Sequence, residues 1–383
     1  MSKIVYPDYN NSILNTITSV LKYYNVESKH NSLKELDKVL EKGYKNIIFF
    51  MLDGMGDIVL NNISKDGYFE LNKIKTVTSV YPSTTTAALT TYYSGKPPYE
   101  SGWVAWSQYF KEYGRSVDML SQNESYERKS LPKTIKKDVF KDVVNYKSIF
   151  EQIEEASPDV DAIEITPNYS EIRAKKSLRA DNLDEAINAI KLVKDGERRK
   201  FIFTYVDAPD SLLHKYGCAS EEVKEYILES ENKIENLVNE LEDTLIIITA
   251  DHGHKDIKKV YSTIDSEELF DMYQMPPALE SRVVAYYIKE NRREEFKNKF
   301  NELYRDKFML LTREEALDLN LFGFGEKHPR LDEFLGDFVA LSISDSIIRL
   351  ETFLCDGKPV KKSTHCGLTE DEMLVPVICI EKK

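Results

Sequence analysis

The chain has 383 residues, with 52 Lys and Arg against 65 Asp and Glu, so its formal net charge is −13 with neutral histidines. This negative charge argues against sequence-independent binding to nucleic acid or to an anionic membrane surface, although bound metal ions could still attract a small anionic substrate. The hydrophobic content of 42% and the charged content of 31% are typical of a globular protein and exclude a largely disordered chain.

The N-terminal residues 1–7 lack the apolar stretch of a secretory signal. The longest strongly apolar run, residues 47–52, is far shorter than the roughly 18 to 20 residues that a membrane span needs. The cysteines show no close paired spacing, which argues against a disulfide framework or a zinc ribbon; they are Cys218, Cys355, Cys366 and Cys379. We therefore expect a reduced, cytoplasmic protein without a membrane partner.

Helical and strand patterns alternate along most of the chain. Two amphipathic helices are predicted first, over residues 13–21 and 33–40. Short apolar runs that read as buried strands follow at 46–51, 161–166, 201–206, 245–250 and 374–380. Helical patterns lie between them at 183–193 and 220–241. This alternation predicts an α/β fold with a largely parallel sheet that is covered on both faces.

Residues 262–350 have a different pattern. Strand candidates at 282–288, 308–311 and 338–343 enclose a charged helix at 292–304. We interpret residues 262–350 as a smaller inserted α+β subdomain, and residues 1–261 together with 351–383 as the catalytic core.

Polar side chains follow several of the predicted strands at the point where each strand ends. They are Asp53, Asp207, Asp210, His214, Asp251 and His252, and His365 precedes the last strand. In an open parallel sheet, groups beyond the carboxyl ends of the strands converge on one edge. Carboxylate oxygens and imidazole nitrogens are ligands for divalent metals of hard to borderline character. The pattern therefore predicts a site for two divalent metal ions.

Each of these side chains also has an ordinary structural interpretation. Asp53 could cap a helix or form a turn, and His214 could pair with Asp210 on a helix surface. Asp251 could belong to a plain turn, and His365 by itself would more often be structural. The coincidence of four such clusters at strand ends favours the metal site.

A segment rich in hydroxyl groups follows a predicted strand at 77–80. Pro82 precedes Ser83, Thr84 and Thr85, and a helical pattern then continues to Gly95. A hydroxyl at a helix N-terminus lies in positive potential among free backbone amides, which suits a nucleophile and the phosphate that it attacks. Threonine is a weak nucleophile and needs a base or a metal to form its alkoxide. The structural alternative is a helix N-cap.

Five segments, in this order, resemble the alkaline phosphatase superfamily, and within it the type I phosphodiesterase/nucleotide pyrophosphatase branch. They are LDGMG at 52–56, PSTTTAAL at 82–89, DAPDSLLHKYG at 207–217, TADHGH at 249–254 and HCGLTEDEMLVP at 365–376. The resemblance spans most of the chain. It implies an alkaline-phosphatase-like three-layer sandwich with a mostly parallel central sheet.

The resemblance also implies roles for particular residues. Asp53, Asp251 and His252 match the ligands of one metal ion, and Asp210, His214 and His365 match those of the other. Asp210 is preferred to Asp207 because its spacing from the preceding proline and from His214 fits the family pattern. Thr85 matches the nucleophile in preference to Thr84 or Ser83. The implied cofactors are two divalent ions, with zinc as the first expectation and manganese or iron as alternatives.

The function implied by the resemblance is metal-dependent hydrolysis of small phosphoric esters. We expect a phosphodiesterase or nucleotide pyrophosphatase that acts through a phosphothreonine intermediate, without a nucleic acid polymer as partner. A phosphomonoesterase, a phosphonate hydrolase and a phosphomutase of the same superfamily are alternatives. A non-enzymatic binding module is disfavoured, because all six ligands and a nucleophile are present.

One departure from the family pattern affects the substrate. Nucleotide pyrophosphatases carry Phe-Pro-Asn after the nucleophile, where this chain has Thr86, Ala87 and Ala88, so a preference for nucleotides is in doubt.

Two further segments have two interpretations each. The aromatic residues at 103–110 could stack on a substrate or pack in the core, and the basic residues at 327–330 could attract an anion or form a solvated loop. His254 and Cys366 also lie beside predicted ligands. His254 is either a partner of a ligand or a surface histidine, and Cys366 is either a soft ligand or a small buried side chain.

Overall fold

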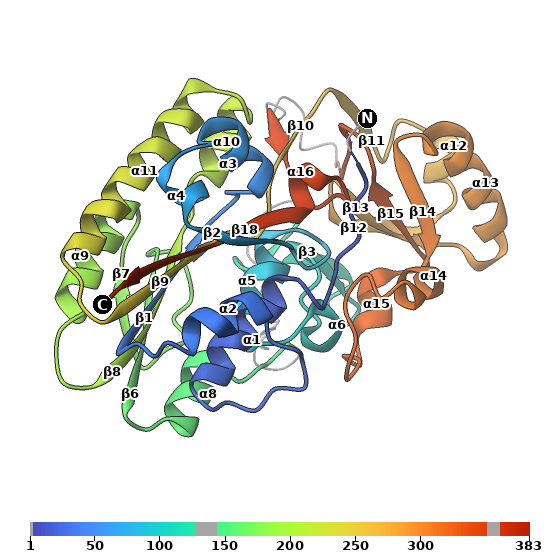
Figure 1. The fold of residues 1–383 in the computed structure, drawn as a ribbon. Coiled ribbons are helices and arrows are strands. Elements are labelled where there is room, and N and C mark those ends of the chain that lie inside the picture. Colours follow the sequence, from blue (N-terminus) through green and yellow to red (C-terminus); the bar gives the residue numbers. More distant parts are fainter. Residues whose placement is uncertain (1–2, 127–143, 351–360) are drawn as a thin grey trace.

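A seven-stranded sheet forms the centre of the computed structural model (Figure 1), which describes residues 3–126, 144–350 and 361–383. Across the sheet the order is β2-β18-β9-β1-β8-β6-β7. The strands are β1 (Asn46–Leu52), β2 (Lys73–Thr78), β6 (Val160–Thr166), β7 (Lys176–Arg179), β8 (Arg199–Val206), β9 (Thr244–Thr249) and β18 (Leu374–Lys382). β1 pairs in parallel with β8 and β9, and β6 pairs in parallel with β7 and β8, whereas β18 is antiparallel to both of its neighbours. The predicted mostly parallel sheet is confirmed.

Helices cover both faces of this sheet and complete a three-layer sandwich (Figure 1). One layer contains α3 (Asp57–Ile63), α4 (Tyr68–Leu71), α9 (Leu183–Val193), α10 (Asp210–Tyr216) and α11 (Glu221–Asn239). The other contains α1 (Ile13–Tyr23), α2 (Lys34–Leu40), α5 (Thr85–Ser94) and α8 (Ile149–Ala156). This is the predicted fold class.

The sequence explains why these segments adopt their structures. All seven residues of β1 are buried, because the strand lies in the middle of the sheet between two helical layers. The helix α11 begins where the Ser220 hydroxyl accepts a hydrogen bond from the Val223 amide. The strand predicted at 77–80 lies instead at 73–78. Its first four residues are only half-buried because β2 is an edge strand, so they carry no apolar pattern.

The direction of the strands brings the predicted site residues to one edge. β1, β8, β9 and β2 all end at the same edge, and the chain then continues into Asp53, Asp210, Asp251 and α5 respectively. β18 runs in the opposite direction, so the segment that precedes it, with His365, lies at this edge too. The topology therefore places five segments that are far apart in the sequence around one location.

Residues 262–350 contain a four-stranded antiparallel sheet of their own, in the order β12-β13-β15-β14. The elements are α12 (Glu267–Phe270), β12 (Tyr273–Glu280), β13 (Val283–Ile288), the 3-10 helix η1 (Glu290–Arg292), α13 (Arg293–Tyr304), β14 (Phe308–Thr312), α14 (Arg313–Asp318), α15 (Leu331–Leu335) and β15 (Phe338–Ser342). A separate apolar cluster around Tyr286, Phe296 and Phe300 fills the space between this sheet and α13. These features support our proposal that residues 262–350 form an inserted subdomain, which we call the insert.

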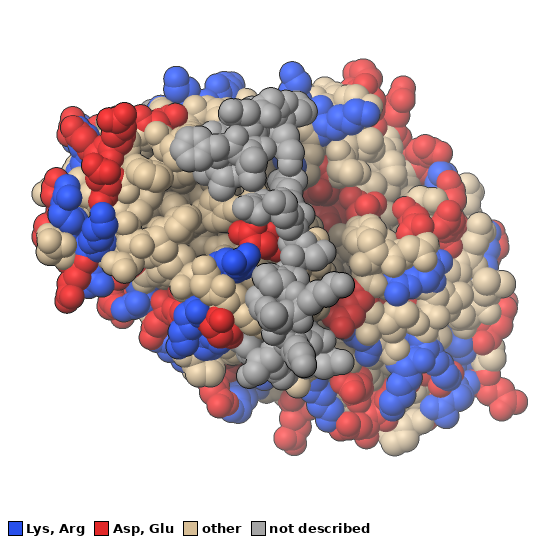
Figure 2. Space-filling view, turned by 180° about the vertical axis from the view of Figure 1, so that it is seen from behind, with Lys and Arg blue, Asp and Glu red and all other residues tan. Residues whose placement is uncertain are grey.

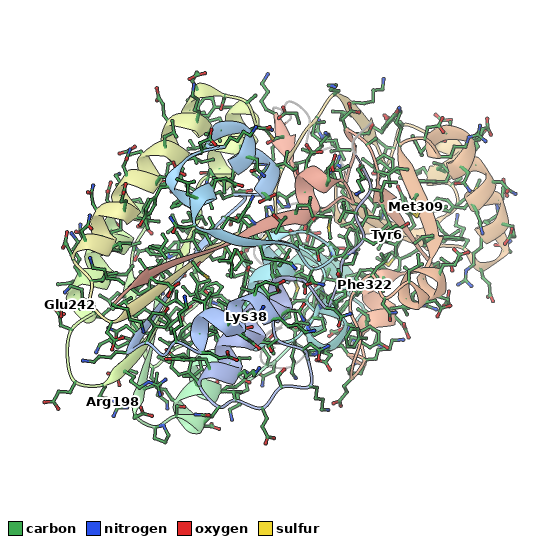
Figure 3. All side chains as sticks on the ribbon, in the orientation of Figure 1. Tyr6, Lys38, Arg198, Glu242, Met309 and Phe322 are labelled. Carbon is green, nitrogen blue, oxygen red and sulfur yellow. The ribbon has the colours of Figure 1, made fainter. Side chains whose placement is uncertain are left out.

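Smaller elements connect the insert to the core. They are α6 (Pro98–Ser101), the sheet of β3 (Ser107–Phe110), β4 (Arg115–Asp118) and β5 (Asn123–Glu124), the pair β10 (Lys255–Asp256) and β17 (Ser363–Thr364), the pair β11 (Lys259–Ser262) and β16 (Ser346–Arg349), and α16 (Glu370–Met373). The N-terminal segment also contacts the insert. The Tyr6 hydroxyl lies 3.7 Å from the Met309 sulfur (Figure 3), and the Tyr9 hydroxyl donates to the Leu321 carbonyl at 2.9 Å.

A fully buried ion pair joins the insert to the segment that carries His365. Arg282, in the β12–β13 turn, donates from Nε and Nη2 to the two carboxylate oxygens of Glu372, at 2.6 and 2.7 Å. Glu372 also accepts hydrogen bonds from the Gly367 amide and the Thr369 hydroxyl. The guanidinium donates its remaining bonds to the carbonyls of Ser344 and Ser346. Every polar atom of the pair is therefore satisfied.

We expect Glu372→Ala to lower the free energy of unfolding by about 3 to 5 kcal/mol, because it leaves the Arg282 charge buried without a partner. Chemical denaturation measures this change. The control is Glu229→Ala, which breaks an exposed pair with Lys233 and should cost less than about 1 kcal/mol. Equal effects of the two substitutions would contradict the role assigned to the buried pair.

Two sequence-based expectations concern the environment of the protein. In the described part of the chain, no helix has both the length and the apolar character needed to cross a bilayer. Cys218, Cys366 and Cys379 are free thiols, and Cys355 lies outside the described residues. The cytoplasmic location stays a prediction.

Candidate metal centre

Asp53, Asp251 and His252 form the first cluster at the carboxyl edge of the sheet. Each offers one ligand atom, and these atoms lie within 4.8 Å of one another. The His252 Nε2 atom is 3.2 Å from Asp251 Oδ2 and 3.6 Å from Asp53 Oδ1. All three side chains are buried.

In each of the two carboxylates of this cluster, one oxygen accepts hydrogen bonds and the other has no hydrogen-bond partner. Asp53 Oδ2 accepts a hydrogen bond from the Tyr205 hydroxyl at 2.7 Å, and Asp251 Oδ1 accepts from the amides of Gly54 and His252 at 2.9 Å. The other oxygens, Asp53 Oδ1 and Asp251 Oδ2, are buried without a hydrogen-bond partner. Two unpartnered carboxylate oxygens facing an imidazole nitrogen fit a divalent cation, because a cation supplies the charge that both lack.

Asp210 is the centre of a second cluster. Four histidine side chains surround it, and one of them, His252, also belongs to the first cluster. Asp210, His252, His254 and His365 offer ligand atoms that lie within 4.8 Å of one another. The Asp210 Oδ1 atom is 2.7 Å from His254 Nε2, 3.4 Å from His214 Nε2 and 3.8 Å from His365 Nε2. The structure thus brings together all six residues predicted as ligands and adds His254 to them.

The four imidazoles have a common orientation. Their Nδ1 atoms face oxygen atoms of the protein: the Ser363 carbonyl for His214, the Gly253 carbonyl for His252, the Ser363 hydroxyl for His254 and the Ser83 carbonyl for His365. A carbonyl oxygen can only accept, so it requires a proton on the Nδ1 atom that faces it. The Ser363 hydroxyl donates to the Leu213 carbonyl and therefore accepts from His254. The Nε2 atom of each ring then faces the carboxylates, and in histidine ligands held by hydrogen bonds from behind this is the atom that binds the cation.

The electrostatics of the site agree with this assignment. Burial lowers the pKa of His254 to about 3, although the hydrogen bond to Asp210 acts in the opposite direction. Burial and the neighbouring imidazoles lower the pKa of His365 well below its ordinary value. Burial and the charges of Asp251 and Asp210 raise the pKa of Asp53 well above its ordinary value. Neutral imidazoles and crowded carboxylates are what a bound cation would stabilise.

Thr85 lies beside the first cluster, at the start of α5. Its Oγ1 atom is 3.3 Å from His252 Nε2, and its side chain is buried apart from a small exposed fraction of 6%. The preceding residue, Thr84, is the N-cap, but its side chain makes no capping hydrogen bond to α5. Thr84 therefore occupies the N-cap position predicted as the structural alternative, but without the side-chain hydrogen bond that usually goes with it.

A cavity of about 850 Å³ opens next to these groups, between the core and the insert. Thr85, Asp210, His214 and His365 line it. Trp106, Glu280 and residues of the β3-β4-β5 sheet and of β16 line it as well. Figure 2 shows the molecule from behind, with acidic and basic side chains interspersed on that face. The cavity is large enough for a small organic molecule.

Several predicted alternatives are resolved by the structure. Asp207 lies apart from the cluster and accepts a hydrogen bond from the Tyr169 hydroxyl. Trp103 is buried, whereas Trp106 is 40% exposed and lines the cavity, so the two tryptophans differ in environment. Cys366 is buried.

The basic residues at 327–330 form ion pairs on the surface of the insert. Lys327 pairs with Asp332, and Arg330 pairs with Glu112 and Glu333. His254, which the sequence left between two interpretations, is buried within the second cluster. Ala87 and Ala88 are fully buried, and their methyl side chains offer no donor in place of the asparagine of the family.

The three-layer sandwich, with Asp and His side chains gathered at the carboxyl edge of its sheet beside a threonine at a helix N-terminus, has the architecture that the resemblance to the alkaline phosphatase superfamily implied. The family model of the type I phosphodiesterases/nucleotide pyrophosphatases matches residues 48–340, and the chain belongs to this family. It is therefore an enzyme that hydrolyses phosphoric esters. A comparison with curated proteins found no significant match.

Solved structures share the fold at low sequence identity. Murine ectonucleotide pyrophosphatase/phosphodiesterase 5 superposes with a TM-score of 0.63 at 15% identity, over 86% of this chain and 87% of the murine chain. An inactive threonine-to-alanine variant of that protein in complex with AMP gives a TM-score of 0.62 at 15% identity, over 86% of this chain and 87% of that chain. Phosphonoacetate hydrolase from Sinorhizobium meliloti 1021, in complex with phosphonoformate, gives a TM-score of 0.59 at 17% identity, over 87% of this chain and 89% of that chain.

Proposed function

We propose that this enzyme is a metal-dependent phosphodiesterase that cleaves small phosphoric diesters or pyrophosphates with Thr85 as the nucleophile. The observation that carries the proposal is the set of imidazole Nε2 atoms and unpartnered carboxylate oxygens that face one another beside the Thr85 hydroxyl. These side chains could hold a cation next to a hydroxyl group that needs one to ionise.

The residues divide into two ligand sets. Asp53, Asp251 and His252 would hold one divalent ion, and Asp210, His214 and His365 the other. Carboxylate and imidazole donors are suited to zinc, with manganese or iron as alternatives. When bound, the ions would act as Lewis acids that lower the pKa of the Thr85 hydroxyl and neutralise charge on the phosphoryl oxygens.

The protein's own residues would then carry out two displacements at phosphorus. The Thr85 hydroxyl loses its proton to solvent, its Oγ1 atom bonds to phosphorus, and the bond from phosphorus to the leaving oxygen breaks while that oxygen takes up a proton from water. In the second step, a water oxygen bonds to phosphorus, the bond to Oγ1 breaks, and Thr85 recovers a proton. The start of α5 directs backbone amides toward the phosphoryl group in both steps.

Substrate class is tested by assaying the enzyme with bis-p-nitrophenyl phosphate, p-nitrophenyl phosphate and phosphonoacetate under the same conditions. We expect kcat/KM for the diester to exceed that for the monoester by at least about tenfold, because the cavity beside Thr85 has room for a second substituent on phosphorus. A preference for the monoester would contradict a diesterase. Hydrolysis of phosphonoacetate alone would favour the second candidate, a phosphonate hydrolase, which the fold similarity to phosphonoacetate hydrolase also supports.

A further inference from the structure

Glu280 of the insert makes hydrogen bonds to three segments that surround the nucleophile. Its Oε1 atom accepts from the Thr84 hydroxyl at 2.7 Å and from the Trp106 amide at 2.8 Å. Its Oε2 atom accepts from the Cys366 thiol at 3.0 Å. One carboxylate thus connects the residue before Thr85, the wall of the cavity and the residue after His365.

The backbone on both sides of this contact adopts an uncommon conformation. Leu279, which precedes Glu280, has a φ of 77°, and Cys366 has a φ of 89°. Side chains other than glycine rarely occupy this left-handed region, and such residues cluster at functional sites because the surrounding structure must hold them there. The backbone before Glu280 and the backbone of its hydrogen-bond partner Cys366 are therefore both held in place by the surrounding structure.

Because the Thr84 hydroxyl hydrogen-bonds to Glu280, it does not cap the N-terminus of α5. Thr84 is the N-cap of α5, a place where a threonine side chain commonly accepts a hydrogen bond from an amide of the first turn. Here the hydroxyl lies 2.7 Å from Glu280 instead, and no capping bond forms. The first-turn amides of α5 are consequently left free of this side chain beside Thr85.

We propose that Glu280 is a positioning residue, which holds the start of α5 through Thr84 and thereby sets the place of the Thr85 hydroxyl. This inference rests on the proposed function, because it takes Thr85 as the nucleophile. Without the carboxylate, the Thr84 hydroxyl would be free to rotate onto the α5 amides, and the Thr85 rotamer would no longer be fixed. A displacement of about 1 Å in a reacting group can cost on the order of a hundredfold in rate.

The test compares Glu280→Ala and Glu280→Gln with the wild-type enzyme on a diester substrate. We expect Glu280→Ala to lower kcat by about 10- to 100-fold with KM changed less than about threefold, because substrate binding does not require the contact. Glu280→Gln should keep kcat within about fivefold of wild type, since its amide oxygen can accept the same bonds from Thr84 and Trp106. Metal content and the thermal midpoint are measured on each variant.

Asp337→Ala is the control for loosening of the insert. Asp337 accepts a hydrogen bond from the Ile288 amide and pairs with Arg293, so its loss should lower the thermal midpoint while leaving kcat within about twofold. A second check is Thr84→Val. If Glu280 acts through Thr84, the double variant Glu280→Ala/Thr84→Val should be no slower than Glu280→Ala alone.

Several results would overturn the proposal. They are a Glu280→Ala enzyme with wild-type kcat, an equal loss in Glu280→Ala and Glu280→Gln, or additive losses in the double variant. Failure of the proposed function has a different signature, because a Thr85→Ala enzyme would then retain turnover whatever the Glu280 variants do.

Discussion

Thr85→Ala should reduce turnover of a diester substrate by at least about a thousandfold, because it removes the oxygen that bonds to phosphorus in the first step. Thr85→Ser keeps that oxygen and should retain activity within about tenfold of wild type. Steady-state kinetics give the loss. Phosphothreonine trapped by rapid acid quench of wild type, and absent from Thr85→Ala, identifies the covalent step.

The matched control for this substitution is Thr91→Ala on the same helix. The Thr91 hydroxyl donates to the Ala87 carbonyl within α5 and lies away from the clusters. Its loss should change kcat less than about twofold. If Thr85→Ala kept wild-type turnover, Thr85 would not be the nucleophile, and Ser83 and Thr84, whose hydroxyls donate to the Gly367 carbonyl and to Glu280, would be the next hydroxyls to test.

The core of the fold could be predicted because its strands are apolar on both faces. The runs at 46–51, 201–206 and 245–250 correspond to β1, β8 and β9, and all three lie in the middle of the sheet. The short strands β3, β4 and β5 were not predicted. They are two to four residues long and contain polar residues, so neither length nor alternation distinguishes them from a loop.

The candidate site was predictable to the extent that it lies at strand ends. The rule that parallel strands present their carboxyl ends at one edge was sufficient to group Asp53 and Asp251 with Asp207 or Asp210, and the choice of Asp210 came from the family resemblance. His254 could not be placed, since nothing in the sequence shows on which side of the TADHGH turn its ring lies. Its partner Ser363 is more than one hundred residues away in the sequence, and a contact of that kind has no local signal.

Glu280 was missed for a related reason. It belongs to the insert. The sequence pattern of the insert predicts a subdomain but does not predict how that subdomain is oriented relative to the core. A single glutamate at the end of an amphipathic strand is indistinguishable from a solvated residue. The only local indication, the left-handed backbone at Leu279, is a property of the folded structure, because leucine does not favour that conformation.

Removing metal ions should abolish turnover and also lower the thermal midpoint of the protein. In the metal-free protein, Asp53 and Asp251 each bury a carboxylate oxygen without a partner, and Asp210 adds to the negative charge. Cations that bind only the folded state stabilise it, by about 2.7 kcal/mol for each site at a free concentration one hundred times the Kd. Dialysis against a chelator, elemental analysis and thermal melts with zinc or manganese added back measure both effects.

The pH dependence of this stabilisation follows from the pKa of Asp53. Because that pKa is raised in the metal-free protein, folded Asp53 retains its proton at a pH where the unfolded carboxyl has lost it. The contribution of Asp53 to stability is therefore present at low pH and is lost as the pH rises through the raised value. Cations compete with the same proton, so the gain in thermal midpoint on adding metal should increase as the pH rises through the raised pKa of Asp53.

Two asparagine variants assign the effect to the cluster. Asp251→Asn removes a negative charge from the first cluster, so its metal-free form should be at least as stable as metal-free wild type, yet it should gain little from added metal. Asp207→Asn changes a carboxylate near the same edge but outside the cluster, so its response to metal should match wild type. An enzyme verified as metal-free that still hydrolysed the diester would refute the mechanism. If Asp207→Asn lost the response to metal and Asp210→Asn kept it, Asp207 would replace Asp210 as the carboxylate ligand in the second set.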